Sequence, residues 1–133
     1  MKYMLDTDIC IYVIREKPRG MLRHLRRTNV MDVCISSITL SGLEYGANKS
    51  SQPERNKVAL AAFLAPVQVA AYDDMAAQAY GRLRAILEKQ GTPIGSFDTL
   101  IAAHALSLDC TLVTNNEKEF RRVPRLRVQN WAK

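Results

Sequence analysis

The sequence has only three cysteines, Cys10, Cys34 and Cys110, and no two of them are close together. A disulfide framework needs paired cysteines and a zinc site needs closely spaced Cys or His ligands, so neither is expected. Each cysteine has an apolar or β-branched neighbour. We therefore predict three buried thiols that pack as small hydrophobic side chains.

Long apolar runs are also absent, since no stretch approaches the ~18 residues that a membrane span needs. The first 14 residues combine one lysine with an apolar stretch, as a signal peptide does, but Asp6 and Asp8 interrupt it and no small-residue cleavage site follows. With 47% hydrophobic and 24% charged residues, the chain has the composition of a globular protein. We expect one domain, residues 1–133, in the cytoplasm and not bound to a membrane.

Histidine is scarce as well, with only His24 and His104. His104 follows Asp98 by six residues, so on one helix it points well away from that carboxylate. No glycine-rich phosphate loop is present, and Ser36 and Ser37 lack the neighbours of a nucleophile elbow. Histidine-based metal sites, nucleotide-binding loops and serine nucleophiles are therefore not expected.

Positive charge, by contrast, is abundant and unevenly placed: the net charge is +6, and basic residues gather near both ends of the chain. Phosphate contacts dominate nucleic-acid affinity, so two such clusters are typical of a polyanion-binding rim, although a solvated helix face remains an equal alternative. The candidate RNA-binding residues are Arg15, Lys17, Arg23, Arg26, Arg27, Arg121 and Arg122.

The hydrophobic pattern predicts short strands that alternate with helices. Strands are expected at about 2–5, 33–35, 67–71, 111–114 and 126–128, and helices at about 8–14, 19–27, 39–47, 53–64, 74–90 and 98–108. This order is typical of an α/β fold with a mainly parallel sheet between helices. Suitable helix caps are Asp8, Thr39 and, at a C-terminus, Gly91.

Several carboxylates have positions that suggest a site. Asp6 ends the first strand, and the pair Asn116 and Glu117 follows the strand at 111–114, so both belong to the carboxyl edge of the sheet, where such folds bind ligands. Asp98 begins a helix after a glycine-containing loop. Glu44 shares a helical face with Leu40, Leu43 and Ala47, where a buried carboxylate would need a cation.

Each carboxylate also has an ordinary structural explanation, as a cap, a turn or an exposed side chain. Together, however, oxygen ligands without a Cys or His cluster favour Mg²⁺, for which Mn²⁺ can substitute. The chemistry that uses such a group is phosphodiester hydrolysis.

Four motifs in order resemble those of PIN-domain toxins of the VapC type: MLDTDI at 4–9, SSITLSGLEYG at 36–46, PIGSFDTLIAAHA at 93–105 and VTNNEKEF at 113–120. The resemblance implies a three-layer α/β/α PIN fold, a Mg²⁺-dependent endoribonuclease, homodimerisation and a VapB-type antitoxin that blocks the site in a hetero-oligomer. It assigns the acidic metal-site roles to Asp6, Glu44 and Asp98. The subgroup it most resembles cleaves initiator tRNA in the anticodon stem-loop.

Two positions depart from the family pattern. Many PIN domains have a fourth aspartate where this chain has Asn116, and Glu119 or Glu117 is a candidate substitute. Many relatives have asparagine where Asp8 stands, and a helix cap is the favoured role for this extra carboxylate.

Two other functions fit parts of the sequence. An aspartate after an apolar strand, as in Asp6-Thr7-Asp8-Ile9, also opens the nucleophile motif of haloacid-dehalogenase-like phosphatases. Their downstream lysine and paired-aspartate motif are not evident, because Asn115 and Asn116 stand after the late strand. The second alternative is a non-catalytic RNA-binding module, since basic surfaces do not require catalysis.

Overall fold

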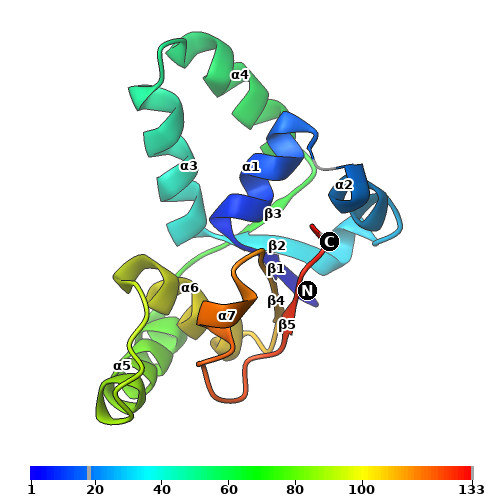
Figure 1. Ribbon diagram of the computed structural model, residues 1–133. Coiled ribbons are helices and arrows are strands. Elements are labelled where there is room, and N and C mark those ends of the chain that lie inside the picture. Colours follow the sequence, from blue (N-terminus) through cyan, green and yellow to red (C-terminus); the bar gives the residue numbers. More distant parts are fainter. Residues whose placement is uncertain (18, 133) are drawn as a thin grey trace.

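The computed structural model describes residues 1–17 and 19–132. Its centre is a five-stranded sheet in which every paired strand is parallel to its neighbour (Figure 1). All five predicted strands are confirmed, with bounds that differ by at most two residues. In spatial order they are β3 (Gln68–Ala70), β2 (Val33–Ser36), β1 (Tyr3–Leu5), β4 (Thr111–Val113) and β5 (Val128–Gln129).

Helices cover both faces of the sheet, which confirms the predicted α/β/α layers (Figure 1). One face carries α1 (Thr7–Arg15), α2 (Arg19–Arg26), α3 (Ser37–Lys49) and α4 (Pro53–Leu64). The other carries α5 (Asp74–Lys89), α6 (Ser96–Ser107) and the short α7 (Glu117–Phe120). The sequence pattern did not predict α7 or the 3₁₀ turn η1 (Val30–Asp32).

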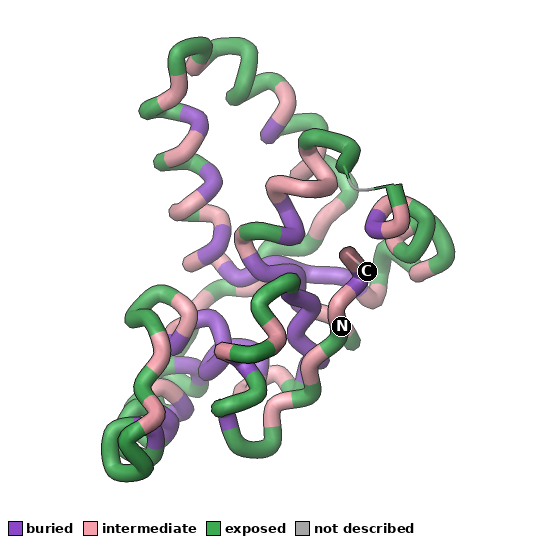
Figure 2. Tube along the Cα trace, in the orientation of Figure 1, coloured by how far each residue is buried: buried purple, intermediate pink, exposed green. Residues whose placement is uncertain are grey.

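Two hydrophobic cores lie on the two faces of the sheet, because successive strand residues point to opposite sides. Met4 and Leu112 pack against α5 and α6, whereas Leu5 and Val113 pack against α1 and α3. Figure 2 shows the buried residues concentrated along these central strands and on the sheet-facing sides of the helices. The three cysteines are free and buried, as predicted. In the described part of the chain, no helix is both long and apolar enough to cross a bilayer.

Three helices, α1, α3 and α6, begin earlier than predicted. Asp6, not Asp8, is the N-cap of α1, and its carboxylate accepts the Ile9 N–H at 2.9 Å. Ser36, not Thr39, caps α3 by accepting the Ile38 N–H at 3.0 Å, and Thr39 is buried inside the helix. Each cap is the residue that directly follows or ends its strand, so the chain turns from strand to helix with no intervening loop.

The ends of the two helices that precede β4 also differ from the prediction. Gln90 is the C-cap of α5, and Gly91 follows it with a left-handed φ of 71°, which a glycine adopts without strain. Gly95 occupies the N-cap position of α6, so Asp98 lies inside the first turn and does not cap the helix. The capping explanation for Asp98 is therefore wrong, and its carboxylate is available for another role.

The strand order places a topological switch point between β1 and β4. From β1 the chain adds β2 and β3 on one side, and β4 and β5 on the other. Ligands of open α/β sheets bind at the carboxyl ends of the strands beside such a point. Here those ends are followed by Asp6 and Thr114.

Candidate active site

Asp6 and Thr114 lie side by side at the switch point. Leu5 pairs with Val113 in the parallel β1–β4 register, and the Asp6 N–H donates to the Val113 carbonyl at 3.0 Å. The Thr114 side chain hydrogen-bonds to the Asp6 carboxylate, and its Oγ1 also accepts the Asn116 N–H at 2.9 Å. The carboxylate is thus fixed from two elements, α1 and the end of β4.

Asp6 is almost completely buried, with 4% of its surface exposed. Burial raises the pKa of Asp6 to about 6, and the negative charge of Asp8 adds to this effect. The hydrogen bonds from Thr114 and the Ile9 N–H lower the pKa and so oppose the shift. A carboxylate at this position loses solvation that a bound cation would replace.

Asp98 lies across from Asp6, in the first turn of α6. Partial burial, together with the adjacent Glu119, raises the pKa of Asp98 to about 7. The charges of Asp6 and Asp8 raise the pKa of Asp98 further. The structure therefore brings four carboxyl groups, those of Asp6, Asp8, Asp98 and Glu119, within electrostatic reach of one another.

Glu119 is held on both of its oxygens. Oε1 accepts the Gly95 N–H at 2.9 Å, and Oε2 accepts the Asn116 side-chain amide in a short hydrogen bond. Asn116 and Glu119 are therefore partners in one contact beside Asp98. Glu117, the other candidate for this place, forms an ion pair with Arg121 at 3.1 Å and accepts from Asn130 at 3.2 Å.

Glu44 is not on the buried face of α3. Leu43 and Ala47 are buried as predicted, but Glu44 is exposed, so the inference that a cation must offset its burial is wrong. Another residue of α3, Gly42, lies near the starts of α1 and α6, where a Cβ would lie 3.5 Å from Phe97 and 3.7 Å from Thr7. Glu44 is two residues further on, about 200° around the helix. Its role as a metal ligand stays a prediction.

The donors at the carboxyl edge fit a hard divalent cation. They are carboxylate and amide oxygens, and the raised pKa values of Asp6 and Asp98 reflect charge that a cation would neutralise. Across residues 1–17 and 19–132, no three Asp, Glu, His or Cys side chains are arranged to enclose a metal. Mg²⁺ does not require such a cage, because it is held by one or two carboxylates and keeps several waters.

The two predicted basic clusters have different surroundings. In the C-terminal cluster, Arg121 pairs with Glu117, and Arg122 donates to the Pro93 carbonyl at 3.0 Å. The N-terminal cluster lines an open groove, and no ion pair within the described chain neutralises it. The role of either cluster in RNA binding stays a prediction.

Thr114 and Gly95 are the contributors that the sequence reasoning missed. Thr114 reaches Asp6 only because β1 pairs with β4, and Gly95 holds Glu119 only because α7 packs beside the start of α6. Both residues stood inside the recognised motifs. A threonine directly after a buried strand, next to the carboxyl edge, was the available signal for Thr114.

Comparisons with known proteins agree with this architecture. The PIN domain family model matches residues 3–126. The tRNA(fMet)-specific endonuclease VapC of Shigella flexneri is 46% identical over 132 residues, covering 99% of each chain, and Ribonuclease VapC2 of Haemophilus influenzae is 46% identical with the same coverage.

Solved structures are similar over the whole chain. DNA-bound VapBC of Salmonella typhimurium superimposes with a TM-score of 0.93 at 45% identity, covering 98% of each chain. VapBC2 of Rickettsia felis, bound to a promoter DNA fragment, gives a TM-score of 0.92 at 41% identity, with 98% of this chain and 99% of that chain covered. The chain therefore belongs to the PIN-domain family and, within it, to the VapC ribonuclease toxins.

Proposed function

We propose that this protein is a Mg²⁺-dependent endoribonuclease toxin that cleaves initiator tRNA in the anticodon stem-loop and so inhibits translation, with Asp6 and Asp98 as its central metal-binding residues. The observation that carries the proposal is the mutual effect of these carboxylates: burial and neighbouring negative charge raise both pKa values at the sheet's switch point. Carboxylates that repel one another but are held close together favour a cation as their ligand.

The chain's own residues fix the geometry of this site. The Ile9 N–H and Thr114 hold Asp6 in one orientation, which leaves little freedom to lose when a ligand binds. The Gly95 N–H and Asn116 hold Glu119 beside Asp98. In this role Glu119 shapes the site and adds negative charge, while Asn116 positions Glu119.

A metal ion held by Asp6 and Asp98 would supply an activated water and would stabilise negative charge on the phosphate. The acidic group itself repels a phosphate, so substrate binding depends on cations elsewhere on the protein. Asp98, whose pKa is raised to about 7, is suited to hold a proton in the metal-free protein and to release it when a cation binds.

The proposed substrate follows from the names of close relatives. The Shigella flexneri and Salmonella typhimurium proteins, 46% and 45% identical to this chain, are named tRNA(fMet)-specific endonucleases. The net charge of +6 supports a nucleic-acid substrate of this kind. We extend the specificity to this chain as part of the proposal.

The proposed partner is a VapB-type antitoxin, because the similar solved structures are VapBC assemblies. We also propose that the toxin forms a homodimer and that the antitoxin joins it in a hetero-oligomer. Since tRNA is a cytoplasmic substrate, we place the protein in the cytoplasm.

Cleavage of purified initiator tRNA tests this function. We expect cleavage in Mg²⁺ or Mn²⁺, none in EDTA, and recovery when excess Mg²⁺ is added. Asp98→Asn should remove cleavage while the protein still binds the RNA. Elongator methionine tRNA serves as the substrate control, and mapping of the cut ends locates the cleaved bond.

The same assay separates the alternatives. Undiminished cleavage in EDTA or by Asp98→Asn would contradict the metal site, and binding without any cleavage would favour a non-catalytic RNA-binding module. The family assignment argues against a haloacid-dehalogenase-like phosphatase, in which Asp6 would be a nucleophile. Hydrolysis of a small phosphate monoester that stops in Asp6→Asn would revive that alternative.

A further inference from the structure

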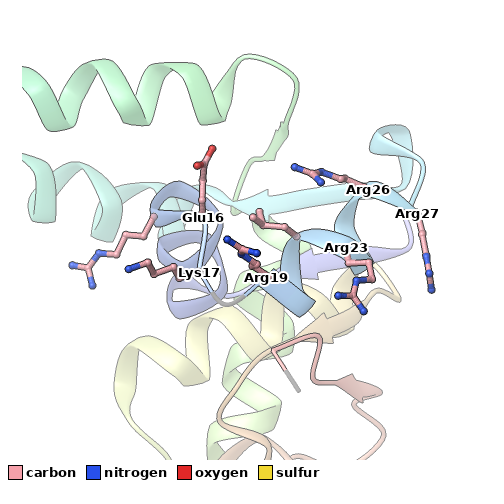
Figure 3. Close-up of a pocket in the computed structure, with 8 residues that line it drawn as sticks. Glu16, Lys17, Arg19, Arg23, Arg26 and Arg27 are labelled. Atoms are coloured by element: carbon pink, nitrogen blue, oxygen red, sulfur yellow. The ribbon is translucent and has the colours of Figure 1, made fainter.

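A basic groove lies where the end of α1 approaches α2. It has a volume of about 680 Å³ and is lined by Arg15, Glu16, Lys17, Arg19, Leu22, Arg23, Arg26 and Arg27, a set that we call the α1–α2 groove (Figure 3). Six of these eight side chains are cationic and only one is acidic. Figure 3 shows the carboxylate of Glu16 pointing away from Lys17 and Arg19.

The cations of the groove have no acidic partners within the described chain. The three ion pairs found there join Arg84 to Glu88, Arg121 to Glu117 and Arg127 to Asp109, all outside the groove. In those three pairs an arginine is neutralised by a carboxylate of the protein, whereas the arginines of the groove are exposed and have no such partner among the described residues. A concentration of unpaired arginines is costly through mutual repulsion, and a polyanion relieves that cost.

The three arginines of α2 share one face. Arg19, Arg23 and Arg26 are spaced i, i+4 and i+7, while Met21, on another side of the helix, is buried in the core. The apolar side thus anchors α2 to the body of the protein and fixes the direction of the arginine face. Guanidinium groups in a fixed array suit phosphate oxygens, which they bind through paired N–H donors.

Helix α1 connects this groove to the carboxylates. Asp8, Tyr12 and Arg15 follow one another at spacings of four and three residues, so they form a line along one side of the helix. Asp8 acts electrostatically on the site, and Arg15 lines the groove. The helix rise between Asp8 and Arg15 is about 10 Å.

Polar groups lie between the acidic site and the α1–α2 groove. The Tyr12 hydroxyl accepts the Asn115 amide at 3.1 Å, and Asn115 in turn accepts the Asn130 amide at 3.1 Å. Asn115 and Asn130 are exposed or partly exposed, and Asn115 immediately follows Thr114 on the carboxyl edge. A polar strip of aromatic hydroxyl and amide groups therefore runs from the acidic site toward the cations.

We propose that the α1–α2 groove binds the sugar–phosphate backbone of the RNA substrate at the C-terminal end of α1, and that the strand crosses Tyr12 and Asn115 between this groove and the carboxylates. This inference rests on the proposed ribonuclease function and specifies the direction in which the RNA leaves the site. The acidic site repels phosphate, and the groove supplies the attraction that holds the strand there. Continuity through α1 favours RNA as the occupant, because the substrate must reach the carboxylates and an array of unpaired arginines suits its phosphates.

The test compares two triple variants that both lower the net charge from +6 to +3. The groove variant is Arg19→Gln/Arg23→Gln/Arg26→Gln, and the control is Arg55→Gln/Arg82→Gln/Lys89→Gln on α4 and α5. Binding of a short fluorescein-labelled RNA stem-loop is measured by anisotropy in EDTA over a series of salt concentrations. A gel checks that the probe stays intact.

We expect the groove variant to bind about tenfold more weakly at about 100 mM salt, with a log–log salt slope about two units shallower than that of the wild type. The control should retain most of the wild-type affinity and slope. A third variant, Arg19→Lys/Arg23→Lys/Arg26→Lys, keeps the charge and should recover most of the affinity, which shows that loss of folding is not the cause.

Equal RNA binding by the groove variant and the control would overturn the inference. So would loss of binding to an acidic peptide with unchanged RNA binding, because the groove would then be a protein-docking surface. If the wild type binds RNA but does not cleave it in Mg²⁺, the proposed function fails while the binding comparison still decides the role of the groove.

Discussion

Thr114 hydrogen-bonds to the carboxylate of Asp6 across the boundary between β4 and β1. These two residues are far apart in sequence, and the parallel pairing of Leu5 with Val113 brings them together. The hydrogen bond stabilises the ionised form of a buried carboxylate, and the same threonine oxygen accepts the Asn116 N–H. Thr114 therefore links the orientation of Asp6 to the start of the segment that carries Glu119.

Replacing Thr114 by valine should shift the pH dependence of cleavage. The hydrogen bond lowers the pKa of Asp6, so its loss raises that pKa above the value of about 6 and reduces the ionised fraction in mildly acidic buffer. We expect cleavage near pH 6 to fall about three- to tenfold, with a smaller loss at higher pH. The pH–rate profile measures this shift.

Thr39→Val is a matched control, because Thr39 is buried and its hydroxyl has no hydrogen-bond partner in the described part of the chain. The acidic limb of the pH–rate profile of Thr39→Val should coincide with that of the wild type. An unchanged profile in Thr114→Val would show that the threonine does not tune Asp6.

Asp98→Asn should stabilise the metal-free protein at neutral pH. The pKa of Asp98 is raised to about 7, so between about pH 4 and pH 7 the folded protein keeps a proton that the unfolded chain has released. Stability conferred by the other contacts is therefore eroded as pH rises through this range. Removing the carboxyl group should recover about 1 kcal/mol at pH 7.5, a figure reduced for solvent screening.

Urea unfolding in EDTA at pH 5 and pH 7.5 measures this effect. The difference between variant and wild type should be small at the lower pH and larger at the higher one. Added Mg²⁺ should stabilise the wild type and not the variant. A variant less stable than the wild type at both pH values would contradict the electrostatic interpretation.

Glu44→Gln should leave cleavage within about twofold of the wild-type rate, because Glu44 is exposed and lies on the side of α3 away from Gly42. Asp98→Asn, measured under the same conditions, gives the loss expected for a proposed metal ligand. A Glu44→Gln rate as low as that of Asp98→Asn would restore Glu44 to the metal site, as the motif resemblance first indicated.

Gly42→Glu should strengthen metal binding. A Cβ at Gly42 makes only ordinary contacts, 3.5 Å from Phe97 and 3.7 Å from Thr7, and these residues adjoin Asp98 and Asp6. A carboxylate at this position adds an oxygen ligand close to the two aspartates, so less Mg²⁺ should be needed for half-maximal cleavage.

Gly46→Glu provides the comparison for this variant. A Cβ there has no neighbour within 4 Å, and the position is one turn further along α3. Each change replaces a helical glycine and should add about 0.5–1 kcal/mol of stability, so thermal melting alone does not separate them. Mg²⁺ titration of cleavage does, and equal titrations would show that Gly42 does not face the metal.

The sequence predicted the strands well because each is a short apolar or β-branched run bounded by polar residues. It also singled out Asp6 and Asp98, whose carboxylates the structure brings within electrostatic reach of each other. Helix starts were less accurate, since Asp6 and Asp8 are both good capping residues and only the backbone geometry selects between them. Gly95 at the N-cap of α6 gives no side-chain signal, so the start of that helix was placed two residues late.

The position of Glu44 shows what periodicity leaves undetermined. Spacing alone put Glu44 on the same face as Leu43 and Ala47, but adjacent helical residues differ by 100°, enough to separate a buried side chain from an exposed one. The contacts of Thr114 and Gly95 depend on strand order and on α7, which are tertiary features. Neighbours in the chain carry little information about either.

The strand order also determines when, during synthesis on the ribosome, the enzyme becomes complete. β1 is made first but occupies the middle of the sheet, and its partner β4 follows more than a hundred residues later. A nascent chain that has not yet reached β4 holds Asp6 without the strand that aligns it. The ribosome therefore makes β2, β3 and the helices α1 to α6 before the site is competent to cleave RNA.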